Sequence, residues 1–241
     1  MELWHGFRQE CFEFEGRKAI VVFPETPDEK KNWTLKTEYW DAFPEAEVEL
    51  LRRGFHVTWL ENVSRLAYKA DSDAKARFAA FLREKYGLRE KCVPVGMSFG
   101  GSCAINFAGE YPELVACLYL DAPVTNFQNI PGRFGDAECE EVWEKEFLAI
   151  YPGMKRWQMF KFADHPINKA DILLEHNLPV LLVYGTQDVT VKFEEHGALL
   201  VEAYEEKPEL MTVMQRVSQG HHPHGFPQKP EIIADYIVAH V

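Results

Sequence analysis

A serine flanked by glycines lies where a short apolar run meets a segment with helical spacing. Residues 96–101 read Gly-Met-Ser-Phe-Gly-Gly, with Ser98 in the middle. A strand–turn–helix unit of this kind holds the serine in a strained turn, where a Cβ at position 96 or 100 would collide with the neighbouring strand or helix. The following helix points its N-terminal N–H groups to where an oxyanion would form. Ser98 is therefore the candidate nucleophile.

A serine hydroxyl reacts only when a base takes its proton, and the base needs a third group that orients it. Three histidines of one late loop are candidates for the base, namely His221, His222 and His224. Two aspartates are candidates for the third group: Asp121, which ends an apolar run, and Asp188, which shortly follows another. Asp188 lies early for the N-cap of the next predicted helix, so we favour it as the acid.

The same three histidines raise the question of a metal site. His221 and His224 are three residues apart, a spacing that metal ligands use. Pro223 breaks a helical arrangement of the two, and neither cysteine nor carboxylate stands nearby in sequence. We therefore expect no metal ion.

Predicted strands and helices alternate along the chain. The predicted strands are the run before Ser98 and residues 7–14, 18–23, 55–60, 114–120, 179–184 and 210–217. The predicted helices are the segment after Ser98 and residues 45–53, 73–86, 193–206 and 231–240. This alternation predicts an α/β fold, with a mostly parallel central sheet and helices on both faces.

Ligands and substrates of such sheets bind beyond the carboxyl ends of the strands. Ser98, Asp121, Asp188 and the histidine loop all follow predicted strands directly. We therefore expect these side chains to meet at one edge of the sheet, despite their separation in sequence.

On these motifs, the chain resembles a small single-domain α/β hydrolase of the serine esterase type. The matching motifs are Gly96-Met97-Ser98-Phe99-Gly100-Gly101, Gly185-Thr186-Gln187-Asp188 and Gly220-His221-His222-Pro223-His224. Their Ser…Asp…His order is that of the α/β-hydrolase fold, and the resemblance covers roughly the whole chain. It implies Ser98 as nucleophile, His221 as general base and then acid, and Asp188 as the group that orients His221.

The resemblance also implies an oxyanion hole. One donor would be the backbone N–H of Phe99. The other would come from the loop after an early strand, which we take to be residues 24–34, although this loop lacks the His-Gly-Gly-Gly form of the family. Trp33 is our candidate there.

Residues 124–175 break the alternation, with helix-like segments, many aromatic residues and no convincing strand. We interpret them as a helical cap inserted into a single domain of residues 1–241. Caps of this fold exclude water and shape the pocket. Trp143 and Trp157 are candidates to face the substrate, and Trp33, Tyr39 and Trp40 are candidates for an opposite wall.

Composition bounds the class of partner. The chain has 241 residues and a formal net charge of −12, which argues against nucleic acid because a polyanion would be repelled. Its five cysteines form no disulfide framework, and no secretory signal or bilayer-spanning run is visible. We expect a cytoplasmic protein with no membrane partner, as a monomer or a small homo-oligomer.

These inferences predict a cofactor-independent serine hydrolase that cleaves a small-molecule carboxylic ester through an acyl-enzyme. A peptidase or amidase would use the same three residues, and a haloperoxidase or C–C hydrolase is a further enzymatic alternative. A binding protein that kept the fold without the chemistry is the alternative from another class.

Overall fold

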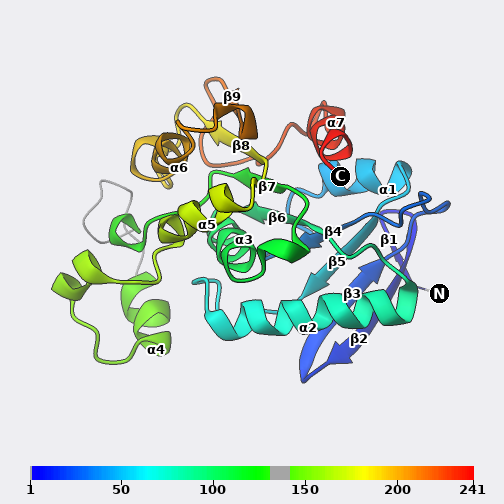
Figure 1. Cartoon of the computed structure of the whole chain (residues 1–241), viewed down its shortest axis with the longest axis horizontal. Helices are drawn as coiled ribbons and strands as arrows, with labels where there is room; N and C mark the ends of the chain where they lie inside the picture. The colour runs from blue at the N-terminus through cyan, green and yellow to red at the C-terminus, as the bar shows by residue number, and fades with distance from the viewer. Residues whose placement is uncertain (1, 131–141) are drawn as a thin grey trace.

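A nine-stranded sheet forms the centre of the computed structural model, which describes residues 2–130 and 142–241 (Figure 1). Its strands are β1 (Glu2–Trp4), β2 (Phe7–Phe14), β3 (Arg17–Val22), β4 (Trp33–Lys36), β5 (His56–Leu60), β6 (Val93–Met97), β7 (Leu118–Asp121), β8 (Val180–Gly185) and β9 (Met211–Arg216). Their order across the sheet is β1-β2-β3-β5-β4-β6-β7-β8-β9. β1, β2, β3 and β5 pair antiparallel, whereas every pair from β5 to β9 is parallel.

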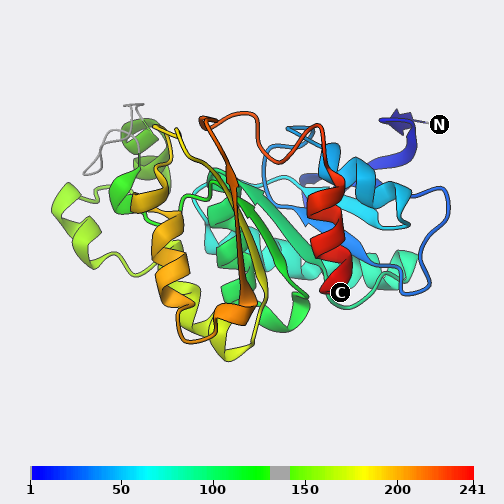
Figure 2. The same cartoon turned by 90° about the horizontal axis from the view of Figure 1, so that it is seen from above.

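Helices cover both faces of this sheet. The α-helices are α1 (Glu45–Arg52), α2 (Lys69–Tyr86), α3 (Phe99–Glu110), α4 (Leu148–Ile150), α5 (Ala170–Glu175), α6 (Gly197–Ala203) and α7 (Glu231–Ala239). One core cluster packs α2, α3, α5 and α6 on one face of the sheet, and a second packs α1 and α7 on the other. Figure 2 shows α1 and α7 side by side on their face of the sheet. The predicted α/β-hydrolase fold class is confirmed.

In the described parts of the chain, segments of 3₁₀- or π-helix join these elements. They are η1 (Pro112–Leu114), η2 (Phe127–Asn129), η3 (Trp143–Phe147), η4 (Arg156–Lys161), η5 (Pro166–Lys169), η6 (Phe193–Glu195) and η7 (Pro208–Leu210). η6 and α6 together replace the single helix predicted over 193–206.

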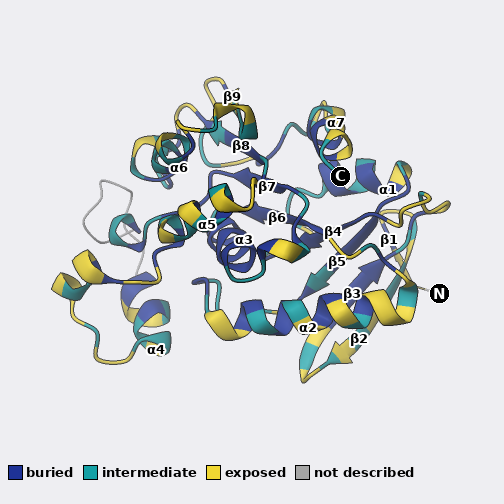
Figure 3. Ribbon diagram, viewed as in Figure 1, coloured by how far each residue is buried: buried dark blue, intermediate teal, exposed yellow. Residues whose placement is uncertain are grey.

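α3 is the central helix, and nearly all of its residues are buried (Figure 3). It is packed between α2 and α5 on the side of the sheet that carries the larger core cluster. A helix buried on all sides must be apolar or made of small residues, and the sequence after Ser98 meets this condition. The element that follows the candidate nucleophile is thereby fixed rigidly to the sheet.

The sequence reading missed one strand that matters for the site. The sequence predicts a single loop over residues 24–34, but β4 begins at Trp33 and runs between β5 and β6. All four residues of β4 are buried, and their apolar–polar alternation, Trp33-Thr34-Leu35-Lys36, has only the minimum length at which alternation indicates a strand. The loop that leaves the carboxyl end of this early strand therefore begins at Thr37.

Residues 124–175 carry η2, η3, α4, η4, η5 and α5, and their described part contains no strand. Residues 131–141 of this segment, with Phe134 and Cys139, lie outside the described residues. A core of its own, built on Phe127, Trp143 and Phe147, joins the segment to Phe99 beside Ser98. Within residues 2–130 and 142–241, no helix is long and apolar enough to cross a bilayer.

Candidate active site

Ser98 lies at the tip of the turn between β6 and α3, with φ of 53° and ψ of −124°. A Cβ on Gly96 would lie 2.5 Å from the carbonyl oxygen of Gly100, so the predicted collision at position 96 is confirmed. A Cβ on Gly100 would lie 3.1 Å from the Cβ of Glu38, a tight contact with the loop after β4. Gly101 is more restricted, because its Cβ would lie 2.4 Å from Pro123. These close approaches hold the serine in its left-handed conformation.

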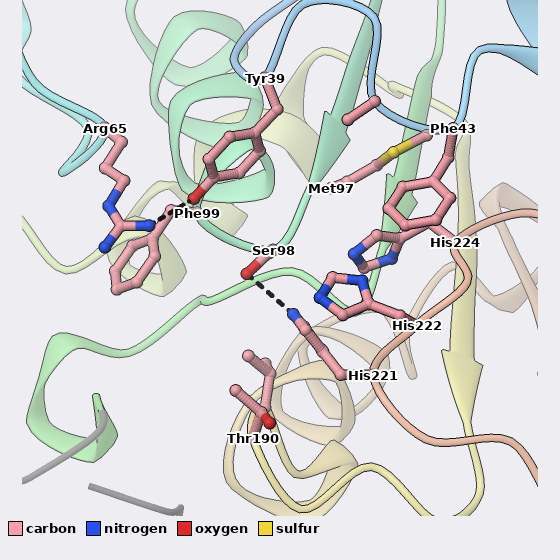
Figure 4. Close-up of a pocket in the computed structure, with 12 residues that line it drawn as sticks. Tyr39, Phe43, Arg65, Met97, Ser98, Phe99, Thr190, His221, His222 and His224 are labelled. Atoms are coloured by element: carbon pink, nitrogen blue, oxygen red, sulfur yellow. Dashed lines mark hydrogen bonds between the residues drawn. The ribbon is translucent and has the colours of Figure 1, made fainter. Parts of the chain in front are cut away.

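The structure brings Ser98, His221 and Asp188 together in a hydrogen-bonded chain. His221 Nε2 lies 3.1 Å from Ser98 Oγ (Figure 4). On the other side of the ring, His221 Nδ1 lies 2.7 Å from Asp188 Oδ2. A carboxylate only accepts, so Nδ1 carries the proton and donates to Asp188. A neutral ring then presents the lone pair of Nε2 to the serine hydroxyl. This is the orientation that a base needs if it is to take the proton of Ser98.

Asp188 is held from its other side by the backbone. Its Oδ1 accepts hydrogen bonds from the N–H groups of Thr190 at 2.9 Å and Val191 at 2.8 Å. Burial alone would raise the pKa of Asp188, but the His221 ring and these two N–H groups outweigh burial and hold the pKa below its ordinary value. The carboxylate therefore stays ionised beside the imidazole.

Asp121 has different partners. Its Oδ1 accepts from His224 Nδ1 at 2.8 Å and from Arg216 Nη2 at 3.0 Å, and its Oδ2 accepts from Gly225 N at 2.6 Å. Tyr119 donates to the same Oδ2 at 3.3 Å. The alternative acid and the alternative base thus form a second, fully buried pair that does not include Ser98.

His222 is exposed and stacks on Phe43, with ring centroids 5.3 Å apart. Partial desolvation of the ring, with the neighbouring rings of His221 and His224, lowers its pKa. Together with these two rings it forms one wall of a cavity of about 290 Å³ that opens beside Ser98. The remaining lining residues are Tyr39, Ala42, Phe43, Arg65, Met97, Phe99, Thr190 and Val191.

The expectation for Trp33 as an oxyanion donor was wrong. Trp33 begins β4 opposite His56, whereas the carboxyl end of the strand, at Lys36, lies beside Val95 and the Ser98 turn. The indole of Trp33 is buried and donates to the carbonyl of Arg89 at 2.8 Å. The predicted opposite wall is right only for Tyr39, because Trp40 packs against Trp4, with ring centroids 4.9 Å apart.

Neither proposed cap tryptophan lines the cavity in the described part of the chain. Trp143 is buried and stacks on Phe147 with ring centroids 4.7 Å apart, and Trp157 is 60% exposed. The segment 124–175 contacts the site indirectly, because its Glu146 binds Arg65, which lines the cavity.

Arg65 was missed by the sequence reading. It donates from Nε and Nη2 to the two carboxylate oxygens of Glu146, at 2.6 and 2.5 Å, and from Nη1 to the Tyr39 hydroxyl at 2.8 Å. Its guanidinium carbon lies 4.6 Å from the centroid of the Phe99 ring. Because Tyr39 Oη accepts from Arg65, its own proton remains available for another acceptor. Burial raises the pKa of Tyr39 to about 12, so the phenol keeps that proton at neutral pH.

One cluster of side chains could hold a metal ion. Among the described residues, only His221, His222 and His224 bring three ligand atoms together, all within 4.8 Å of one another. The three histidines meet in an irregular loop, so the helical arrangement that Pro223 breaks is not needed to bring them together.

Comparisons with known proteins agree with this geometry. Residues 54–237, more than half of the chain, match the model of the prolyl oligopeptidase family. No curated protein sequence matches the chain significantly.

Three solved structures illustrate the likeness in fold. An acylaminoacyl peptidase from Pyrococcus horikoshii is 11% identical, with a TM-score of 0.74 over 97% of this chain and 42% of its own. A puromycin hydrolase is 17% identical, with a TM-score of 0.70 over 95% and 37%. Est1E from Butyrivibrio proteoclasticus is 13% identical, with a TM-score of 0.64 over 96% and 98%.

The chain spans well under half the length of the first two of these proteins, but nearly the whole length of the third. The family match covers the candidate nucleophile, the acid and the base, from Ser98 to His221. The chain thus belongs to the prolyl oligopeptidase family and has the α/β-hydrolase fold.

Proposed function

We propose that the protein is a serine hydrolase that cleaves a carboxylic ester with a short acyl group, through an acyl-enzyme on Ser98. The observation that carries the proposal is the hydrogen-bonded chain from Ser98 through His221 to Asp188, set on a left-handed turn at the carboxyl edge of the sheet. The cavity of about 290 Å³ is at the small end of ligand pockets, which favours a compact substrate.

In the first half of the reaction, Ser98 Oγ attacks the ester carbonyl while His221 Nε2 takes the hydroxyl proton. The same Nε2 then gives this proton to the departing alkoxide, and the alcohol leaves. Asp188 keeps Nδ1 protonated and stabilises the imidazolium in between. In the second half, water takes the place of the alcohol, and His221 again serves as base and acid while the carboxylic acid is released.

The negative charge on the carbonyl oxygen needs donors that are already in place. We assign one to the backbone N–H of Phe99, the first residue of α3, where the helix also places its positive end. We assign the other to the hydroxyl of Tyr39, which lines the cavity with Ser98 and whose oxygen is held by Arg65. Tyr39 thus takes the role that was expected of Trp33.

A peptidase or amidase is the second candidate. The family model is that of the prolyl oligopeptidases, and two of the three solved structures are an acylaminoacyl peptidase and a puromycin hydrolase. The chemistry would be the same, but the leaving group would be an amine that must be protonated as it departs.

Paired substrates with the same short acyl group, one an alkyl ester and one an unactivated amide, distinguish the two candidates. We expect turnover of the ester, loss of that turnover in Ser98→Ala, and no measurable cleavage of the amide. Cleavage of short peptides or of the amide with a higher kcat/KM than the ester would replace the esterase proposal by the peptidase one.

A further inference from the structure

The histidine loop carries more imidazole groups than the hydrolytic mechanism uses. The ring centroids of His221, His222 and His224 form a nearly equilateral triangle, with sides of 4.7, 4.9 and 5.0 Å. One nitrogen from each ring lies within 4.8 Å of the others, and Figure 4 shows the three rings gathered on one side of Ser98. We propose that these three histidines form an inhibitory site for a divalent transition-metal ion such as Zn²⁺.

The hydrogen bonds leave one nitrogen free of a carboxylate on two of the rings. Nδ1 of His221 donates to Asp188, and Nδ1 of His224 donates to Asp121. Each ring therefore has Nε2 left to coordinate a metal. Metal-binding histidines nearly always donate their other ring N–H to a carboxylate or carbonyl, which fixes the ring and makes it a better ligand. Two of the three rings already have a carboxylate in that position.

The spacing suits a small ion. Zinc–nitrogen bonds of about 2.0–2.1 Å in a tetrahedral site place two ligand nitrogens about 3.3 Å apart. Nitrogens within 4.8 Å reach that spacing if each ring moves by less than about 1 Å. His222 is exposed and can move most easily, whereas His224 is buried and fixed by Asp121. Three imidazole ligands suit Zn²⁺, Cu²⁺ or Ni²⁺ rather than Mg²⁺ or Ca²⁺.

The charges around the site also permit a cation. Asp188 and Asp121 lie directly behind the rings, and one buried cation, Arg216, is bonded to Asp121.

Occupation of the site would block hydrolysis by a simple competition. Metal coordination takes the Nε2 lone pair of His221, which is the atom 3.1 Å from Ser98 Oγ. The base can then no longer accept the serine proton, and the enzyme is reversibly inactive until the metal leaves. This consequence rests on the proposed function, whereas metal binding itself does not.

Co²⁺ titration of the tag-free chain, followed by its visible absorption, tests binding without any turnover. We expect one tetrahedral Co²⁺ per chain in the wild type and in Ser98→Ala, displaced by Zn²⁺. His222→Ala, at an exposed position, should weaken binding by at least about tenfold. The matched control is His176→Ala, an exposed histidine at the end of α5, which should leave the titration unchanged.

Fluorophosphonate labelling of Ser98 tests the inhibition. Zn²⁺ should slow labelling of the wild type, EDTA should restore it, and His222→Ala should need at least about ten times more Zn²⁺ for the same relative slowing. The site is refuted if the wild type binds no stoichiometric Co²⁺ or if His222→Ala binds it as tightly. Tight binding without slower labelling refutes the inhibition, whereas an unlabelled, metal-free wild type refutes the proposed function and leaves the Co²⁺ result valid.

Discussion

Two carboxylate–imidazole pairs lie side by side in this protein, and their hydrogen bonds are almost equal in length. His221 Nδ1 lies 2.7 Å from Asp188 Oδ2, and His224 Nδ1 lies 2.8 Å from Asp121 Oδ1. The pairs differ in what surrounds them. The first reaches Ser98 through the free ring nitrogen and borders the cavity, whereas the second is buried and its carboxylate also binds Arg216.

The difference indicates a division of labour between the pairs. Arg216 links Asp121 to the backbone carbonyls of Gly220, His221 and Pro223, so the second pair fastens the loop that carries the first. The same chemical pair thus serves as a reactive unit where a nucleophile faces it and as a structural clamp where a cation neutralises it. Substitutions in the Asp188–His221 pair should lower the reaction rate, whereas substitutions in the Asp121–His224 pair should lower the stability of the fold.

Asp188→Asn should produce the largest change in rate. The amide cannot stabilise the imidazolium and favours the wrong ring tautomer, so kcat on an ester should fall by about 10⁴. Thermal unfolding should change little, because the Asn oxygen can still accept from Val191 N. Steady-state kinetics and a melting curve on the same preparation check both statements. A variant with near-normal kcat would remove Asp188 from the mechanism.

Tyr39→Phe should have the next largest effect, because it deletes one assigned oxyanion donor. Removal of one such donor lowers kcat by about 10²–10³, with little change in KM when the contact forms only in the transition state. Trp33→Phe is the matched control, since it also removes a single donor group and that indole bonds to Arg89 far from Ser98. Equal kcat losses in the two variants would contradict the assignment.

Asp121→Asn should act on stability instead. It leaves the buried Arg216 cation without its carboxylate and places an amide NH₂ against Gly225 N–H or the other donors. Loss of one partner of a buried ion pair costs about 3–5 kcal/mol, so the free energy of unfolding in urea should fall by about that amount. The folded fraction should retain kcat within about tenfold of the wild type. A stable variant with kcat as low as that of Asp188→Asn would exchange the roles of the two pairs.

The smallest expected effect is a pH dependence of stability from His224. Burial lowers the pKa of His224, and the nearby His221 ring and Arg216 guanidinium act in the same direction. The hydrogen bond and charge of Asp121 raise the pKa but do not cancel this shift. The unfolded chain takes up this proton below about pH 6.5 while the folded chain does not, so this stabilisation is complete above that pH and is lost as pH falls toward the lowered pKa. His196, whose pKa burial lowers to about 4, acts in the same direction.

Urea unfolding at pH 7.5 and pH 5.5 measures the contribution of His224 to the free energy of unfolding. His224→Gln should lose less stability than the wild type between these two pH values. The prediction fails if the wild type and His224→Gln show the same change between them.

Sequence patterns located the nucleophile because its turn depends on local residues. Gly96, Ser98 and Gly101 are neighbours in the chain, and the steric conditions that define the turn act among them and Pro123. The family order then predicted Asp188 and His221 as partners. The residues alone left Asp121 and His224 open, since Asp121 ends β7 beside β8 and the ring directions depend on Arg216, 95 positions away from Asp121.

The prediction of the second oxyanion donor was wrong for a physical reason. β4 alternates apolar and polar residues, but it is only four residues long, the minimum over which such alternation indicates a strand between flanking loops. Without β4, the sequence pattern places the oxyanion loop too early, at residues 24–34, and indicates Trp33 in place of Tyr39. Arg65 has no local pattern at all, because its role depends on contacts with Tyr39 and with Glu146, 81 positions away.

Peptide mapping by mass spectrometry after fluorophosphonate treatment tests the central claim most directly. The account predicts one stoichiometric adduct on the peptide that contains Ser98, no adduct in Ser98→Ala, and strongly slowed labelling in Asp188→Asn but not in folded Asp121→Asn. A wild type that hydrolyses its ester yet carries the adduct elsewhere, or carries none, would contradict it.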